Sequence, residues 1–436
     1  MQSEDSLATL RFSILIFQFS VLAFSFSSMR LLESYRVLDL TGPLGFLTGR
    51  ILADLGADVI KIEPPGGDPS RRLPPLPGPE SLYWLAYNAN KRSVTLDIYG
   101  DEGRALFLKL LATSDFVIES FQPGTLETLG LSYDALSKEQ PALILVSITP
   151  FGEQGPYRDF QASDLEIMAA SGAMSLAGER GGEPMRITAP QAPMWAGAEA
   201  AMGALTALPY RGVTGRGQHV DVSAQAALIS ALAHAPAFWD LNRINPERDG
   251  IYVTGRNVNG AKMRVFWECR DGWINFIIYG GAAGRHTNQQ LVGWMDEKAM
   301  APEWLKQMDW STFDVTTTTQ GFVDEIEAPI AEFFSTLTKQ QFLDGVLHRQ
   351  MLGYPVSTVE DISNDRQLAA RYFWQDVPCP GLDSTLKYPG GFAIINGERL
   401  RIRRPAPRVG EHNHEVFVEE LGLSASEIED SQLVST

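Results

Sequence analysis

The sequence predicts an α/β protein built on a doubly wound, mostly parallel sheet, with a second, smaller inserted domain. The first observation is that apolar strand patterns alternate with amphipathic helix patterns from Tyr35 to Ile148, as such sheets require. The second is composition, because 436 residues with 44% hydrophobic and 20% charged content suit a globular chain with a large core. The third is a separate run of strand patterns within residues 242–339.

The regular pattern opens with a β-α-β unit. The segment RVLDL (residues 36–40) is predicted to form a strand, residues 45–55 a helix, and ADVIKIE (residues 57–63) a second strand, which two prolines then close. Sequential parallel strands joined by a helix form the unit from which doubly wound sheets are built.

Three glycines in the first strand-to-helix turn resemble a dinucleotide-binding turn. Gly42, Gly45 and Gly49 are separated by two and then three residues, whereas the dinucleotide fingerprint places its first two glycines one residue apart. We therefore predict a tight structural turn here and do not expect a nicotinamide enzyme.

The alternation continues along the chain. We predict strands at residues 93–98, 115–120 and 142–148, an amphipathic helix at residues 102–112, and a helix from about Met194 to Arg211. The last of these is rich in Ala and Gly, so close packing against another backbone is expected. The following TGRGQHVDVS (residues 214–223) suits a glycine turn that leads into a strand, with His219 a partly exposed strand residue and not a base.

Four segments describe the predicted domain organisation. Residues 1–28 contain an apolar run, Phe12 to Phe26, without a basic front or a small-residue cleavage site, and are predicted to be an extension ahead of a natural start at Met29. Residues 29–241 are the first part of the large domain, residues 242–339 the smaller domain, and residues 340–436 a return segment that completes the large domain.

The smaller domain is predicted to begin with a hairpin and a glycine loop. A D-G turn between Glu268 and Trp273 suits the hairpin. Gly280, Gly281 and Gly284 could present backbone N–H groups to a developing oxyanion, and a plain strand-to-helix turn is an equally good interpretation. Large aromatic residues usually bury, so a core position is predicted for the following residues: Trp267, Trp273 and Trp294.

Charge and cysteine content exclude several functions. The formal net charge of −17 repels phosphate backbones, so we expect no nucleic-acid partner. Cys269 and Cys379 are the two cysteines and lie far apart, so neither a disulfide framework nor a metal site is expected, and a cytoplasmic location is predicted.

Five segments occur in an order typical of one enzyme family. They are the stretch VLDLTGPLGFLTGRILADLGADVIKIEPPGGD, then YNANKRSVTLDI, ESFQPGTLETLGL, SITPFGEQGPY and TGRGQHVDVS. Together with DRQLAARYF and GEHNHEVFVEELG near the C-terminus, they resemble the class III CoA-transferases, the family of formyl-CoA and carnitine CoA-transferases. This resemblance spans about residues 30–429. It implies an interlocked dimer, an acyl-CoA substrate and a carboxylic acid acceptor, with no metal and no membrane partner.

The resemblance also implies a set of CoA-binding residues. The loop after the strand at residues 115–120 would line the adenine and pantetheine path, at the edge of the sheet where open α/β folds bind ligands. Arg and Lys near Asn90 could meet phosphate groups, although a solvated basic face is the simpler interpretation of that pair. The predicted residues are Pro43, Asn90, Lys91, Arg92, Leu96, Ser120, Phe121, Gly124, Thr128 and Leu129.

One departure from the family concerns its nucleophile. In the family, the segment Asp-x-x-x-Gly supplies a carboxylate that attacks the thioester. The matching position here is Pro193, within APQAPMWAG, where no acid occurs. A proline cannot act as nucleophile, base or thioester acceptor. The nearest acids, and hence the weak catalytic candidates, are Asp164 and Glu199.

The related α-methylacyl-CoA racemases use a His-Asp pair for proton transfer. Ser163 stands at the histidine position and Pro193 at the partner aspartate position, so a racemase of that kind is not expected. Asp164 survives from this segment, and a helix N-cap is favoured over catalysis for it.

Three functional interpretations follow. The chain is either the subunit lacking the nucleophilic aspartate in a heteromeric CoA-transferase, or a homodimeric transferase that uses a displaced carboxylate, or an acyl-CoA binding protein without turnover. The sequence does not distinguish the acceptor acid or the CoA donor.

Overall fold

The computed structural model describes residues 30–76, 78, 81–253, 257–379, 382 and 384–424. The predicted extension at residues 1–28 lies outside the described residues. In the part of the chain that the structure covers, none of the helices combines the length and the apolar content that crossing a bilayer requires.

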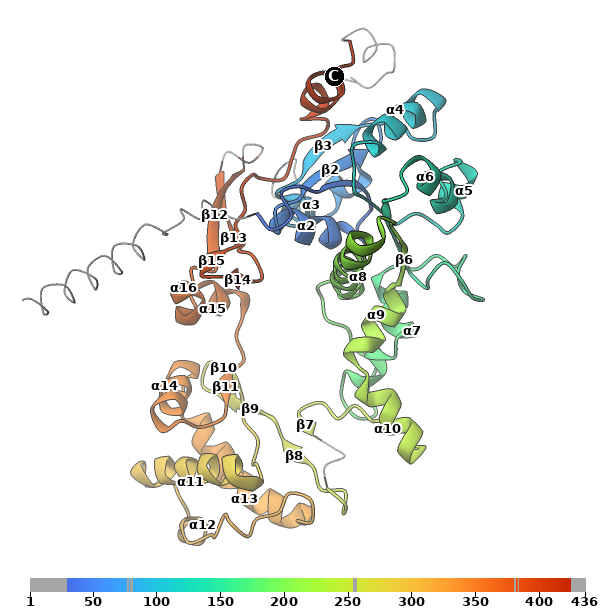
Figure 1. Cartoon of the computed structure of the whole chain (residues 1–436). Coiled ribbons are helices and arrows are strands. Elements are labelled where there is room, and N and C mark those ends of the chain that lie inside the picture. Colours follow the sequence, from blue (N-terminus) through green and yellow to red (C-terminus); the bar gives the residue numbers. More distant parts are fainter. Residues whose placement is uncertain are drawn as a thin grey trace, which may run out of the picture. The chain divides into compact units, whose positions relative to one another are not determined.

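A six-stranded sheet with the order β3-β2-β1-β4-β5-β6 confirms the predicted α/β class (Figure 1). Parallel pairing joins β1 to β2, β2 to β3 and β5 to β6. The order reverses between β1 and β4, which makes their carboxyl ends the switch point at which open α/β sheets bind ligands. The strands are β1 (Arg36–Leu40), β2 (Asp58–Glu63), β3 (Arg92–Thr95), β4 (Phe116–Glu119), β5 (Ile144–Thr149) and β6 (His219–Ser223).

Strands β4 and β5 show why the sequence forms this sheet. Every residue of β4 and of β5 is buried, and continuous apolar runs are expected where a parallel sheet is covered on both faces. The predicted strands and helices of this region therefore all form. The helices are α2 (Phe46–Asp54), α3 (Leu82–Asn88), α4 (Asp101–Leu111), α5 (Thr125–Thr128), α6 (Tyr133–Glu139), α7 (Asp164–Ala170), α8 (Ala192–Thr214), α9 (Ala224–Ala231) and α10 (His234–Asn242), with 3-10 turns at Pro69–Arg72 and Ala173–Leu176.

Packing explains the glycines of the first turn. A Cβ at Gly45 would lie 2.6 Å from the side chain of Thr41 and 2.9 Å from that of Ile148, closer than real Cβ contacts allow. This glycine is therefore required by the approach of the turn to β5, as the prediction of a structural turn implies.

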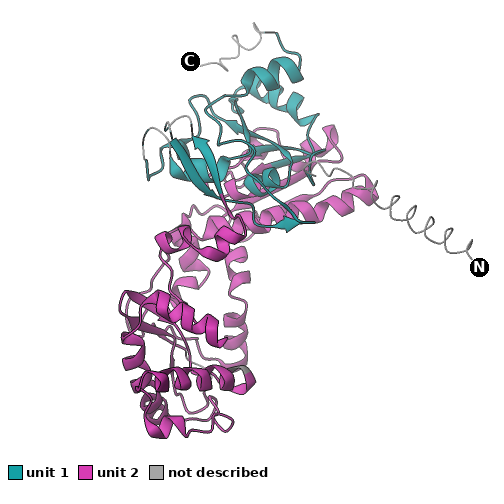
Figure 2. Cartoon of the chain, turned by 90° about the vertical axis from the view of Figure 1, so that its left-hand side faces the viewer, with its two compact units in different colours: residues 1–39, 49–117, 375–436 teal, residues 40–48, 118–374 magenta. Residues whose placement is uncertain are grey.

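The chain forms two compact units, coloured separately in Figure 2. Unit 1 comprises the described residues within 1–39, 49–117 and 375–436, and unit 2 comprises those within 40–48 and 118–374. In unit 1 the C-terminal segment returns to β3, where the N–H of Thr95 donates to Asn413 Oδ1 at 2.9 Å and the N–H of Ser93 to His412 Nδ1 at 3.2 Å. The predicted domain boundaries at residues 241 and 339 stay a prediction.

Within unit 2, a smaller sheet and four helices enclose their own core. The sheet has the order β11-β10-β9, and β9 and β10 form the predicted hairpin, with Gly272 opposite Cys269. The strands of this sheet are β9 (Phe266–Cys269), β10 (Gly272–Asn275) and β11 (Tyr354–Pro355), and the four helices are α11 (Gly281–Glu297), α12 (Glu303–Lys306), α13 (Gln320–Ser335) and α14 (Lys339–Arg349). The same part of the chain also contains β7 (Tyr252–Val253), β8 (Met263–Arg264), α15 (Val359–Ser363) and α16 (Arg366–Ala370).

The tryptophans of this region divide between core and surface. Trp267 and Trp294 lie in the core as predicted, but Trp273 is 40% exposed, so its predicted core position is wrong. Successive residues of a strand point to opposite faces, and the neighbouring Ile274 occupies the core side of β10 with no exposed surface.

The C-terminal segment adds two hairpins and a short helix. These elements are β12 (Trp374–Cys379), β13 (Ser384–Pro389), β14 (Ile394–Ile395), β15 (Glu398–Arg399) and a π-helical turn at His414–Glu420.

Candidate functional site

The switch point brings two predicted CoA-binding segments together. The turn after β1 contains Gly42 and Pro43, and the loop after β4 begins with Ser120. The N–H of Gly42 donates to Ser120 Oγ at 2.7 Å, so a direct hydrogen bond joins the two loops within unit 2. Pro43 is exposed and Ser120 is half-buried, which leaves both accessible to a ligand.

The loop after β4 is short and well defined. The N–H of Phe121 donates to Glu119 Oε2 at 2.6 Å, and Gly124 has a φ of 89°, a left-handed conformation that favours glycine, at the start of α5. Phe121 and Gly124 are half-buried, Thr128 is exposed, and Leu129 follows as the C-cap of α5. The predicted residues of this loop therefore share one accessible surface segment.

The basic segment before β3 has a different role in the structure. Lys91 is fully buried, and its Nζ lies 2.8 Å from Asp39 Oδ2 and 3.0 Å from Asn88 Oδ1. Burial lowers the pKa of Lys91 to about 8, although Asp39 opposes that change.

The neighbours of Lys91 are occupied in the same way. Arg92 is 4% exposed and pairs with Asp58 and Glu420, at 2.6 Å and 2.5 Å. The side-chain amide of Asn90 donates to Asp54 at 2.6 Å, and Leu96 is 2% exposed. These four side chains hold unit 1 together, and the geometry gives no support to their predicted contacts with CoA.

Helix α8 begins at the segment in which the family resemblance implies a nucleophile. Pro193 is buried in the first turn of α8. Thr48 Oγ1 donates to the carbonyl of Gly197 at 3.1 Å, and a Cβ at Gly197 would lie 2.8 Å from Leu47 Cβ. The predicted close packing of α8 is confirmed, because this face of the helix lies directly against the start of α2.

Asp164 is held at this end of α8. Its Oδ1 accepts the N–H groups of Gln191 and Ala192, both at 2.8 Å. The prediction that Asp164 caps the nearby helix is therefore wrong, because Ser163 caps α7 through a capping box with Glu166. Asp164 instead caps α8, which begins 28 residues further on. A carboxylate is favourable at this positive end of a helix.

The other candidate acid lies further along α8. Glu199 is six residues past Pro193 and half-buried, which places it about 9 Å along the helix axis. Of the two candidates, Asp164 is therefore the one held at the Pro193 turn.

The glycine segment of the smaller sheet forms a helix start. Gly280 is the N-cap of α11, and Gly281 has a φ of 71°. Both are accessible, whereas Gly284 is buried against Tyr279. The structure thus places two of the three predicted loop glycines at the open N-terminus of a helix.

A polar cluster beneath the Ser120 loop was not predicted. Glu119 is 3% and Ser147 1% exposed, and Ser147 donates a side-chain hydrogen bond to Glu119. Ser147 Oγ lies 2.9 Å from His219 Nε2, which lies 3.3 Å from Glu153 Oε2. Burial raises the pKa of Glu119 to about 7. The signal in the sequence is a polar residue within each of two otherwise apolar buried strands, FVIE and ILVSIT.

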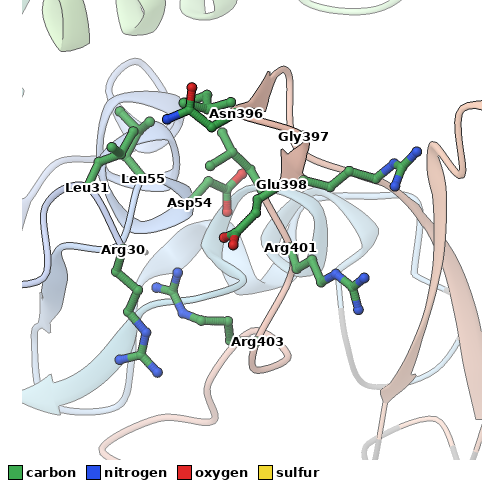
Figure 3. Close-up of a pocket in the computed structure, with 12 residues that line it drawn as sticks. Arg30, Leu31, Asp54, Leu55, Asn396, Gly397, Glu398, Arg401 and Arg403 are labelled. Carbon is green, nitrogen blue, oxygen red and sulfur yellow. The ribbon is translucent and has the colours of Figure 1, made fainter. Parts of the chain in front are cut away.

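A cavity of about 710 Å³ lies in unit 1 (Figure 3). Its wall joins the start of the described chain and the end of α2 to the β14–β15 hairpin, and arginines and apolar side chains line it. No predicted site residue belongs to this wall. The lining includes Arg30, Leu31, Asp54, Leu55, Glu398 and Arg403. Among the described residues, no group of three or more His, Cys, Asp or Glu side chains is arranged to hold a metal ion.

Comparisons with known proteins identify one family. The profile of CoA-transferase family III matches residues 32–413. The subunit BbsE of succinyl-CoA:(R)-benzylsuccinate CoA-transferase from Thauera aromatica is 36% identical over 91% of this chain and 95% of its own length. The beta subunit of succinyl-CoA–L-malate CoA-transferase from Chloroflexus aurantiacus is 30% identical over 87% of this chain and 91% of its own. A CaiB/BaiF family protein from Brucella suis superposes with a TM-score of 0.74 at 28% identity, covering 89% of this chain and 98% of that one.

Proposed function

The chain belongs to CoA-transferase family III and is an enzyme of that type, and we propose that it is the subunit lacking the nucleophilic carboxylate in a heteromeric transferase. The complete enzyme moves CoA from a donor acyl-CoA to a carboxylic acid. A carboxylate attacks the thioester carbonyl and releases CoA thiolate, leaving a mixed anhydride. The thiolate then attacks the enzyme acyl carbon, which releases the donor acid and leaves an enzyme-bound CoA thioester. The acceptor carboxylate attacks this thioester and releases CoA thiolate, and the thiolate attacks the acceptor acyl carbon of the new anhydride, which releases the acceptor acyl-CoA and the enzyme carboxylate.

The observation that carries the proposal is Pro193 at the start of α8. The side chain is buried in the first helical turn and has no group that can form an anhydride or a thioester. A related partner chain with an aspartate at this position would supply the missing group. Two of the relatives described above are named as subunits, which supports this arrangement.

The surface of unit 2 supports a large partner interface. Trp195, Met202 and Val213 on α8 are 42%, 57% and 88% exposed, and their spacing of seven and eleven residues puts them on one face of the helix. On α10, Trp239 and Leu241 are 44% and 82% exposed. Exposed apolar side chains along one face of a helix suit a protein contact, as the interlocked dimer of the proposal requires.

The proposal includes the location of bound CoA and the cellular setting. Pro43 and the loop from Ser120 to Leu129 form the path for CoA, because they meet at the switch point of the sheet and are accessible. The cysteines, Cys269 and Cys379, are both free thiols, which supports a reducing, cytoplasmic setting.

A homodimer that uses Asp164 is the second candidate. The hydrogen bonds at Asp164 Oδ1 hold its carboxylate beside the Pro193 turn. This is the one specific observation that favours a displaced nucleophile.

Trapping the covalent intermediate distinguishes the two candidates. The tagged chain is purified from its own cells, incubated with succinyl-CoA, and each chain of the complex is measured by intact mass with and without hydroxylamine, which cleaves acyl thioesters. The proposal expects a second family chain at equal amount, with the CoA adduct on that chain alone. An adduct on this chain that disappears in Asp164→Asn supports the homodimer and contradicts the proposal. Purification without a second chain also contradicts it.

A further inference from the structure

The polar cluster beneath the Ser120 loop fixes that loop on one side. Glu119 is the last residue of β4, and its Oε2 accepts the N–H of Phe121 at 2.6 Å. On the other side, Ser120 Oγ accepts the N–H of Gly42 at 2.7 Å. The backbone of Ser120 and Phe121 is therefore held between a carboxylate beneath it and the neighbouring loop.

The hydrogen bonds around Glu119 all suit its ionised form. The Ser147 hydroxyl hydrogen-bonds to Glu119 and favours its ionised form, and Ser147 Oγ lies 2.9 Å from His219 Nε2. An ionised carboxylate only accepts hydrogen bonds, whereas a protonated one must donate at one oxygen. Protonation of Glu119 removes the charge that strengthens the hydrogen bonds from the Phe121 N–H and the Ser147 hydroxyl.

The charges that face this carboxylate are mostly acidic. Glu127 on α5 and Glu153 after β5 both disfavour ionisation of Glu119. Glu153 itself faces His219 and Asp221 on β6 and Arg158 in the loop after β5. Tyr133 of α6 stacks on the ring of His219.

The space around Glu119 is too small for a ligand. The cavity between Glu119, Ser147 and His219 has a volume of about 10 Å³, room for one water molecule at most. The cluster therefore acts on the loop above it and does not bind substrate itself.

We propose that Glu119 is a positioning residue whose carboxylate holds the Phe121 amide, and thereby the CoA-contacting surface of the Ser120–Gly124 loop, in its binding conformation. The inference rests on the proposed function, in which this loop lines the CoA path. Loss of the carboxylate charge weakens the hydrogen bond from the Phe121 N–H, and thereby CoA binding, without touching any reacting atom.

Two independent measurements test the proposal on the full chain or its native complex. The dissociation constant of CoA is measured by calorimetry from pH 5.5 to 8.5, and deuterium uptake of peptides covering residues 119–125 is compared between variants at each pH. A hydrogen bond to a charged acceptor is strong enough that we expect CoA to bind about tenfold more weakly at the acidic end. Glu119→Ala is expected to bind weakly at every pH, with faster exchange of the loop.

Glu119→Gln and Glu327→Gln are the informative comparison. The amide of Glu119→Gln keeps an acceptor for the Phe121 N–H but cannot ionise, so the pH dependence of CoA binding is expected to disappear in this variant. Glu327 is also a buried carboxyl, 8% exposed, that accepts a backbone N–H, from Arg264 at 2.7 Å, and its glutamine variant should keep the wild-type pH dependence.

The outcomes separate this inference from the function on which it rests. If loop exchange in Glu119→Ala and Glu119→Gln equals that of the wild type at every pH, the positioning role is overturned. If exchange responds to these variants while CoA affinity does not, positioning of the backbone is supported and the proposed CoA contact of the loop fails.

Discussion

Replacing Glu119 by glutamine should change how the stability of the protein depends on pH. The pKa of Glu119 is raised by burial from 4.5 to about 7, so the folded state disfavours the ionised form. Well below pH 4.5 the raised pKa does not change the free energy of unfolding, because the carboxyl is protonated in both the folded and the unfolded chain. As the pH rises to 7 the unfolded chain releases the proton first, and stability falls. The full change in the pKa of Glu119 corresponds to a loss of about 3 kcal/mol in the free energy of unfolding.

Urea unfolding of the full chain at pH 4.5, 6 and 7.5 measures this contribution. In the wild type, Glu119 should remove about 3 kcal/mol from the free energy of unfolding between the lowest and the highest pH. Glu119→Gln has no ionisation to lose, so its free energy of unfolding minus that of the wild type should grow by about the same amount over this range.

The difference between the two proteins cancels the titration of other groups. A difference that stays constant within about 0.5 kcal/mol, the usual spread of surface substitutions, would refute the assignment of an uncompensated buried carboxyl at Glu119. A difference that falls with rising pH would show that the hydrogen bonds from Ser147 and Phe121 outweigh burial.

Three further predictions concern stability and are measured by the same unfolding experiment. Gly197→Ala should lower the free energy of unfolding by about 1–3 kcal/mol, because its Cβ would overlap α2. Gly212→Ala lies on the same helix at a place where a Cβ meets nothing within 4 Å, so it should raise the free energy of unfolding by up to about 1 kcal/mol. Equal effects of the two variants would contradict the packing of α8 on α2. Lys91→Met should lower the free energy of unfolding by about 3–5 kcal/mol, because it removes the cation 2.8 Å from buried Asp39. A loss below about 1 kcal/mol, the value of an exposed ion pair, would contradict the buried pairing of Lys91 with Asp39. Burial raises the pKa of Glu327 to about 7, so stability should fall less from pH 4.5 to 7.5 in Glu327→Gln than in the wild type, and identical pH profiles would exclude this effect.

Local patterns in the sequence were sufficient to predict the six strands of the main sheet and the helices α2, α4 and α8. The apolar runs of β4 and β5 and the small residues of α8 carry their structural role in their own composition. The burial of Trp273 was predicted wrongly because side-chain size says nothing about which face of a strand a residue occupies. That choice depends on the register of β10, which places Ile274 in the core.

The candidate site depends on contacts between distant segments, which patterns do not contain. Asp164 caps a helix that begins 28 residues later, and a local rule assigned it to the nearer α7. Lys91 and Arg92 look like ligands for phosphate until the structure places Asp39 and Glu420 beside them. Pro193, in contrast, could be identified from the sequence, because a missing functional group needs no coordinates.

The two hydrogen bonds accepted by Asp164 occupy backbone N–H groups at the N-terminus of α8. Asp164 takes the N–H groups of Gln191 and Ala192, Pro193 has no N–H, and Met194 and Trp195 donate to the carbonyl of Gln191 at 3.0 and 3.1 Å. Every backbone donor that a helix start normally offers to an anion is thus occupied or missing. A thioester brought to this turn would find no free backbone donor for the negative charge that develops on its oxygen, and the carboxylate held there, that of Asp164, already accepts two N–H groups.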